Sequence, residues 1–158
     1  MKFYIKFISV IVLGWFPLQL LHEAGHMISC KLNGGSIHRI AFHFNIFTET
    51  IREGSRHPVI DIWMGPIIGI LLPLLLLILP LKKNIREILF IFCAVCLIGN
   101  GLYIGLGWLC DGGDGWELIR YKVNLAWLIL FGLPATLAGL VILMKIKEKP
   151  IAAERLMK

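Results

Sequence analysis

Residues 7–30 read FISVIVLGWFPLQLLHEAGHMISC, and this stretch decides the class of fold. It carries no charge as far as Leu21, and only then come His22, Glu23 and His26. A membrane-spanning helix needs about 20 mostly apolar residues, so the stretch is long enough to cross a bilayer. Lysines precede it as in a signal peptide, but no small-residue cleavage site follows. We therefore interpret it as a retained transmembrane helix with polar side chains near its end.

Three further apolar runs follow, at residues 58–80, 88–110 and 123–144. The run at 58–80 holds Asp61 and four prolines, so part of it could be re-entrant rather than helical. The 158 residues are 58% hydrophobic and 16% charged, whereas a soluble domain is about 45–50% apolar and about 25% charged. This composition excludes a soluble globule. We predict an all-α polytopic membrane protein with about four transmembrane helices, in one integral-membrane domain over residues 1–158.

The segment at residues 33–57, between the first two runs, has a different pattern. Asn33-Gly34-Gly35 is a typical helix stop, because Gly and Asn accept the left-handed conformation of a C-terminal cap. Apolar and polar residues then alternate over residues 40–47, which predicts a strand or short hairpin at the membrane interface. Its edge could pair with an extended peptide, or the strand could simply cover the helix ends.

The net charge of +6 comes from basic residues in short clusters between the apolar runs. Such clusters suit anionic lipid headgroups and the control of topology, so we expect the lipid bilayer as a partner and no nucleic acid. Their distribution favours a cytoplasmic N-terminus.

The segment His22-Glu23-Ala24-Gly25-His26 is an H-E-x-x-H motif. On a helix, residues four apart share one face, so both imidazoles can reach a single Zn²⁺. The intervening Glu23 can then act as a base toward a water molecule. Histidine and glutamate are costly inside a membrane and are functional there by default, although they could instead form a structural cluster between helices.

A catalytic zinc usually has three protein ligands, so a third must come from elsewhere in the chain. The segment at residues 110–117 lies between the last two runs, on the same membrane side as the end of the first helix. Its acidic residues Asp114, Asp111 and Glu117 are the candidates. The alternative is an ordinary interhelical turn in which an aspartate caps a helix.

A rival chemistry is suggested by Cys93-Ala94-Val95-Cys96, which has the C-x-x-C spacing of thiol oxidoreductases. No polar neighbour in this span would activate a thiol, so buried cysteines that act as small apolar residues are the simpler interpretation. Cys30 and Cys110 end two helices on one side, and the sequence leaves open whether they pair.

Together these features resemble the site-2 protease group of intramembrane zinc metalloproteases, the M50 class. The resemblance lies in H-E-A-G-H within an early membrane helix, a following Gly-Gly and interfacial strand, Gly65-Pro66 in the second run, and an Asp-Gly near the end of a later span. In that family two histidines and a distant aspartate bind zinc, and the glutamate is the catalytic base. The resemblance therefore implies His22 and His26 as zinc ligands and Glu23 as the base.

For the third ligand, the family pattern is Asp-Gly followed by a helix with apolar residues four and five places on. Asp114-Gly115 matches this pattern, whereas Asp111-Gly112 places Gly115 where an apolar residue should be. We therefore prefer Asp114, with Asp111 as the fallback. The Asn and Pro that usually precede the family's Asp-Gly are not at their usual spacing, and Asn100 is the preceding asparagine here.

We predict an intramembrane zinc metalloprotease that hydrolyses peptide bonds of membrane-embedded substrates, in the plasma membrane of a prokaryote. Zinc would polarise the water and the scissile carbonyl, while Glu23 would move the proton to the leaving amine. The strand at residues 40–47 would hold the unwound substrate extended. A thiol–disulfide oxidoreductase and a non-catalytic metal-binding adaptor or chaperone are the alternatives. The sequence leaves open whether the protein forms a homo-oligomer or binds an accessory membrane protein. It also leaves open the side of the membrane to which the site opens.

Overall fold

The computed structural model describes residues 2–41 and 49–156, and the chain there is largely helical. Within these ranges four helices are long and apolar enough to cross a membrane, and a two-stranded antiparallel sheet follows the first of them. The predicted fold class is therefore confirmed. In chain order the elements are α1 (Lys2–Leu32), β1 (Ser36–Ala41), β2 (Glu49–Glu53), α2 (Pro58–Leu76), α3 (Lys83–Gly107), α4 (Gly113–Arg120) and α5 (Leu125–Leu156).

The second apolar run forms one continuous helix, α2, in spite of its prolines. Pro58 lies in the first turn, where a missing N–H costs nothing, and Pro66 and Pro73 lie inside the helix. The run therefore spans as a helix in the described structure rather than as a re-entrant segment. The helix ends at Leu76, four residues before Pro80, because Pro80 has no N–H to donate to the Leu76 carbonyl and its ring would clash with that carbonyl.

The predicted strand is present, but it begins earlier than the alternation at residues 40–47 indicates. β1 starts at Ser36 and pairs antiparallel with β2, with Ile40 opposite Thr50 and Ala41 opposite Glu49. The rest of the predicted strand, residues 42–47, lies outside the described residues. The hairpin follows the Asn33-Gly34-Gly35 stop closely, and Gly34 has the left-handed φ of +78° expected of such a cap.

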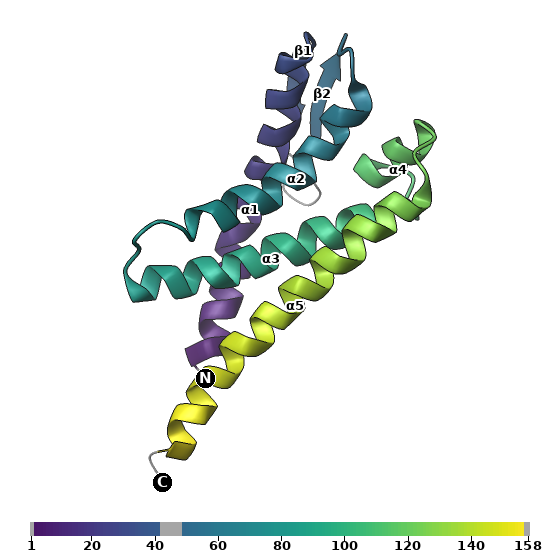
Figure 1. The fold of residues 1–158 in the computed structure, drawn as a ribbon. Helices are drawn as coiled ribbons and strands as arrows, with labels where there is room; N and C mark the ends of the chain where they lie inside the picture. The colour runs from purple at the N-terminus through teal and green to yellow at the C-terminus, as the bar shows by residue number, and fades with distance from the viewer. Residues whose placement is uncertain (1, 42–48, 157–158) are drawn as a thin grey trace.

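The helices are arranged so that the hairpin and α4 lie at the end of the molecule opposite to both termini (Figure 1). Helices α3 and α5 run side by side over most of their length, and α1 crosses them with α2 against it (Figure 1). Four buried side chains from four different helices form a small core beneath α4: Ile62, Ile104, Leu118 and Leu128. This core fixes α4 to the membrane helices and so determines where its acidic residues lie.

Candidate metal centre

Helix α1 presents His22 and His26 to one point, and α4 brings Asp114 to the same point. The Nε2 atoms of His22 and His26 lie 2.8 Å and 3.1 Å from Oδ2 of Asp114. One nitrogen or oxygen atom from each side chain lies within 4.8 Å of the other two. In the described part of the chain, no other group of three or more His, Cys, Asp or Glu side chains converges in this way.

The other acidic candidates of the same segment lie away from the histidines. Asp111 is exposed and does not belong to the convergent group. Glu117 is partly exposed and forms an ion pair with Arg52, whose Nη2 lies 3.1 Å from Oε2 of Glu117. Of the three candidates that the sequence offered, the structure therefore brings Asp114 to His22 and His26.

The local backbone explains why Asp114 points inward. Gly113 has a φ of +77°, a conformation that L side chains rarely adopt, and a Cβ there would lie 2.5 Å from the hydroxyl of Tyr103. The amide of Asp114 donates a hydrogen bond of 3.3 Å to that same hydroxyl. A glycine is thus required immediately before Asp114, and it turns the first residues of α4 toward α1.

The electrostatics of the site keep the Asp114 carboxyl ionised. Burial alone would raise the pKa of Asp114, but the charge of His26 and the hydrogen bonds from His22 and His26 outweigh burial. The pKa of Asp114 therefore lies well below its ordinary value. When both imidazoles are neutral, the ionised carboxylate gives these three side chains a net negative charge, which suits a bound cation.

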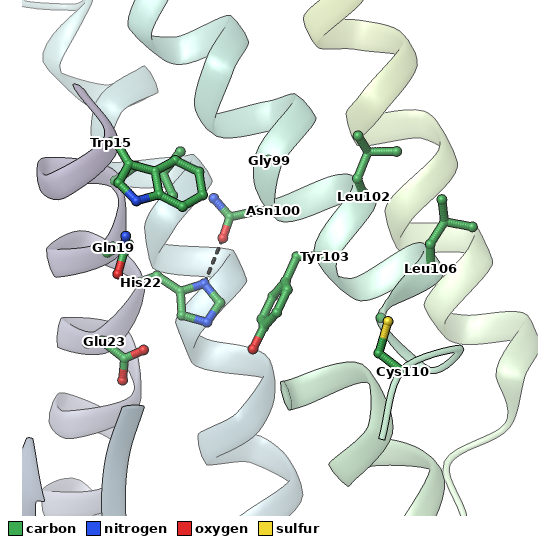
Figure 2. Close-up of a pocket in the computed structure, with 12 residues that line it drawn as sticks. Trp15, Gln19, His22, Glu23, Gly99, Asn100, Leu102, Tyr103, Leu106 and Cys110 are labelled. Carbon is green, nitrogen blue, oxygen red and sulfur yellow. Dashed lines mark hydrogen bonds between the residues drawn. The ribbon is translucent and has the colours of Figure 1, made fainter. Parts of the chain in front are cut away.

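Both imidazole rings are oriented through their Nδ1 atoms. Nδ1 of His22 donates to Oδ1 of Asn100 at 2.7 Å, an interaction that joins α1 to α3 (Figure 2). Nδ2 of Asn100 donates to the carbonyl of Cys96 at 2.9 Å, so its Oδ1 faces the histidine. Nδ1 of His26 donates to the backbone carbonyl of Asp61 at 2.7 Å. Because Nδ1 donates in both rings, the Nε2 atoms are the ones directed at Asp114, and a ring that is neutral there would offer its Nε2 lone pair to a cation.

Asp61 itself joins the start of α2 to the end of α1. Its Oδ1 accepts hydrogen bonds from the hydroxyl of Ser29 at 2.6 Å and from Nδ2 of Asn33 at 2.7 Å. These bonds fix the first turn of α2, and with it the carbonyl that holds His26. Asp61 is therefore a positioning residue, which acts through His26.

Two glycines let α1 and α2 approach closely at the site. A Cβ on Gly25 would overlap the carbonyl of Met64, and a Cβ on Gly65 would overlap the ring of His26. Gly25 thus belongs to the H-E-A-G-H segment for a steric reason, and Gly65 opens the space that His26 fills. The glycines of both motifs set the distance between the two helices.

Glu23 lies on α1 beside the convergent group and is buried. Its Oε2 atom has no hydrogen-bond partner. An unpaired buried carboxylate oxygen is costly, and such atoms occur where a water molecule, an ion or a catalytic role accounts for them. Two imidazole lone pairs, one ionised carboxylate and an adjacent free carboxylate oxygen match the nitrogen and oxygen ligands and the base of a catalytic zinc site. The residues present therefore fit Zn²⁺.

The cysteines form no comparable group. Cys93 and Cys96 are almost fully buried within α3, and all four cysteines of the chain are free. Cys30 is buried whereas Cys110 is exposed, so these two do not pair.

These features define a multi-pass membrane protein with a His–His–Asp group at one end of its helices. The family model of the peptidase M50B-like family matches residues 8–104, which is more than half of the chain. The chain therefore belongs to the peptidase M50B-like family, a family of peptidases, and the predicted resemblance is confirmed. Searches of the curated proteins and of the solved structures gave no match. The matched region contains His22, Glu23 and His26, and it ends before Asp114.

Sequence reasoning noted Asn100 only as the asparagine that precedes the Asp-Gly pair, and it missed the carbonyl of Asp61 and the hydroxyl of Tyr103. Asn100 carried a usable signal, because an uncharged polar residue inside a membrane span usually has a buried partner. The carbonyl of Asp61 carried none, since every residue has a carbonyl.

Proposed function

We propose that this protein is a zinc-dependent endopeptidase that hydrolyses peptide bonds of membrane-embedded substrates. The observation that carries the proposal is the convergence of His22, His26 and Asp114 beside the unpaired carboxylate oxygen of Glu23. Membership of a peptidase family supports the same conclusion. We further propose that the membrane is the plasma membrane of a prokaryote.

In this mechanism His22, His26 and Asp114 would hold the zinc ion. When bound, zinc would act as a Lewis acid toward the attacking water and the scissile carbonyl. Asn100 and the carbonyl of Asp61 keep the histidine lone pairs aimed at the site.

Glu23 performs the proton transfers. Its carboxylate takes a proton from the attacking water as the new C–O bond forms at the scissile carbonyl, and it donates that proton to the leaving amine as the C–N bond breaks. The unpaired Oε2 is available for this role because no other described group uses it.

The substrate has to unwind locally, because the amide of a residue inside a helix is already hydrogen-bonded. The β1–β2 hairpin beside the site supports the proposal that an extended segment of substrate pairs with a strand edge.

The test is Glu23→Gln in the full-length protein purified in detergent, with a membrane-spanning peptide as substrate and zinc content measured on the same sample. We expect zinc to be retained while cleavage falls by about 10²- to 10⁴-fold, the usual contribution of a general base. Glu87→Gln is the matched control, since Glu87 lies near the start of α3, away from the site, and forms an ion pair with Lys6. Cleavage by Glu23→Gln at the parental rate would overturn the mechanism. If neither the parental protein nor Glu23→Gln cleaves any substrate, the non-catalytic adaptor alternative is favoured.

A further inference from the structure

An apolar cavity of about 350 Å³ lies between α1 and α3 and leads directly to the proposed catalytic residues. Ligand pockets commonly have volumes of about 300–1,000 Å³, so this one is large enough for a bulky side chain. We propose that it receives a large apolar side chain of the substrate, next to the scissile bond, and thereby determines which bonds are cleaved. This inference rests on the proposed peptidase function and names the specificity of the same site.

The cavity has two kinds of wall. Most of its lining is apolar and includes Trp15, Leu102 and Leu106 (Figure 2). At one side the lining consists instead of His22 and Glu23. The apolar and the reactive surfaces are therefore parts of one continuous space.

The lining residues follow the helical repeat on both helices. On α3 they recur at residues 99–100, 102–103 and 106–107, and on α1 at residues 15, 18–19 and 22–23, so each helix contributes one face. From residue 99 to residue 107, where α3 ends, the axis of the helix advances by roughly 12 Å, whereas an extended chain advances by about 3.3 Å per residue. The cavity is thus long enough for about three or four residues of an extended peptide.

The mixed lining favours a peptide over a lipid chain as the occupant. An acyl chain against Glu23 would cover its Oε2 atom without pairing it, which costs free energy. A peptide brings amide and carbonyl groups to the polar side and can place an apolar side chain against Leu102 and Leu106. An occupant therefore needs both polar backbone groups and an apolar side chain to match the two walls.

Cys110 provides a natural reporter, because it lines the same cavity and is exposed. The other cysteines, Cys30, Cys93 and Cys96, are buried. A thiol-reactive probe should therefore label Cys110 selectively, and an occupant of the cavity should slow that labelling.

The first test measures labelling of Cys110 in the full-length Glu23→Gln protein, so that the peptide is not consumed. The probes are two Lys-flanked, Ala-rich membrane-spanning peptides of about 20 residues, with Gly-Phe or Gly-Ala at the centre. We expect the Phe peptide to slow labelling several-fold more than the Ala peptide, and Leu106→Trp to remove that difference by filling the cavity. Equal labelling rates with both peptides, or protection by a detergent-solubilised phospholipid as strong as that by the Phe peptide, would overturn the inference.

The second test measures cleavage of the same two peptides by the protein with its Glu23 intact. We expect kcat/KM to be at least about 10-fold higher for the Phe peptide, because a hydrophobic pocket discriminates by about 10- to 200-fold for a single methylene group and Phe exceeds Ala by a phenyl ring. Leu106→Trp should reduce this ratio to near one while zinc content is retained. Ile88→Trp is the matched control, because Ile88 is exposed on the same helix and does not line the cavity.

The two proposals fail in different ways. If the protein cleaves neither peptide but the Phe peptide still protects Cys110, the cavity proposal stands and the peptidase function fails. If both peptides are cleaved equally and Leu106→Trp changes nothing, the function stands and the cavity is not the specificity site.

Discussion

Two short motifs on membrane helices invite comparison, the H-E-A-G-H of α1 and the C-A-V-C of α3. Each motif places two side chains that can bind a metal or undergo redox chemistry about one helical turn apart. All four of these side chains are buried. The histidines meet Asp114 from α4, Asn100 from α3 and a carbonyl of α2. Cys93 and Cys96 belong to no such group among the described residues.

The difference shows that spacing within one helix does not make a site. A pair of ligands becomes a centre only when other elements supply a third ligand and the hydrogen bonds that orient the first two. In this protein the loop before α4 and the close approach of α1 and α2 provide both. The pair in α3, three residues apart instead of four, consists of side chains that serve packing.

The strongest test of the comparison removes the third ligand. Asp114→Asn should lower zinc affinity and cleavage by more than about 100-fold, because loss of a direct ligand exceeds the 10- to 100-fold cost of losing an orienting partner. Asp111→Asn is the matched control, since Asp111 is exposed three residues away, and it should leave both quantities within about twofold. Isothermal titration with zinc and peptide cleavage measure the two effects. An equal loss in both variants, or a loss in Asp111→Asn alone, would show that the wrong aspartate has been assigned.

A smaller effect is expected when an orienting partner of the histidines is removed. Asn100→Leu eliminates the acceptor for Nδ1 of His22, so zinc affinity should fall by about 10- to 100-fold. Asn100→Asp keeps an acceptor at that position and should lose less. Zinc affinity and thermal stability measured together separate loss of orientation from loss of folding. If the Leu variant binds zinc as tightly as the Asp variant, the hydrogen bond to His22 does not support the site.

The smallest effect is expected from the cysteine motif. Cys93→Ala and Cys96→Ala should each leave cleavage within about twofold, because a buried thiol in apolar surroundings is unreactive. Peptide cleavage before and after treatment with a thiol reagent checks this expectation. Loss of all activity in both variants, with Glu23→Gln still active, would instead support the thiol–disulfide alternative.

Much of this architecture could be predicted from local sequence. The four helices follow from apolar runs of sufficient length, and the shared face of His22 and His26 follows from helical geometry. Asp114 was favoured over Asp111 by the resemblance, because Asp114-Gly115 and the apolar residues after it match the family's Asp-Gly pattern. The start of β1 was misplaced because Ser36–Arg39 lacks the clear alternation that residues 40–47 show.

The supporting interactions depended on how the helices cross, which local sequence does not specify. From the sequence, Asp61 could cap a helix, pair with Arg52 or Arg56, or support the metal site. The packing of α2 against α1 makes its backbone carbonyl the partner of His26. The role of Gly65 likewise appears only when the His26 ring is seen to occupy the space beside it. Contacts between a backbone atom of one helix and a side chain of another do not require a particular residue type, so the sequence does not reveal them.

If α1, α2, α3 and α4 together form a zinc site, the purified full-length protein should contain the metal, and elemental analysis measures this. We predict one zinc ion per chain in the parental protein and a strongly reduced content in His26→Ala at the same total protein and purity. Absence of zinc from the parental protein after purification in zinc-supplemented buffer, or an unchanged content in His26→Ala, would contradict the account.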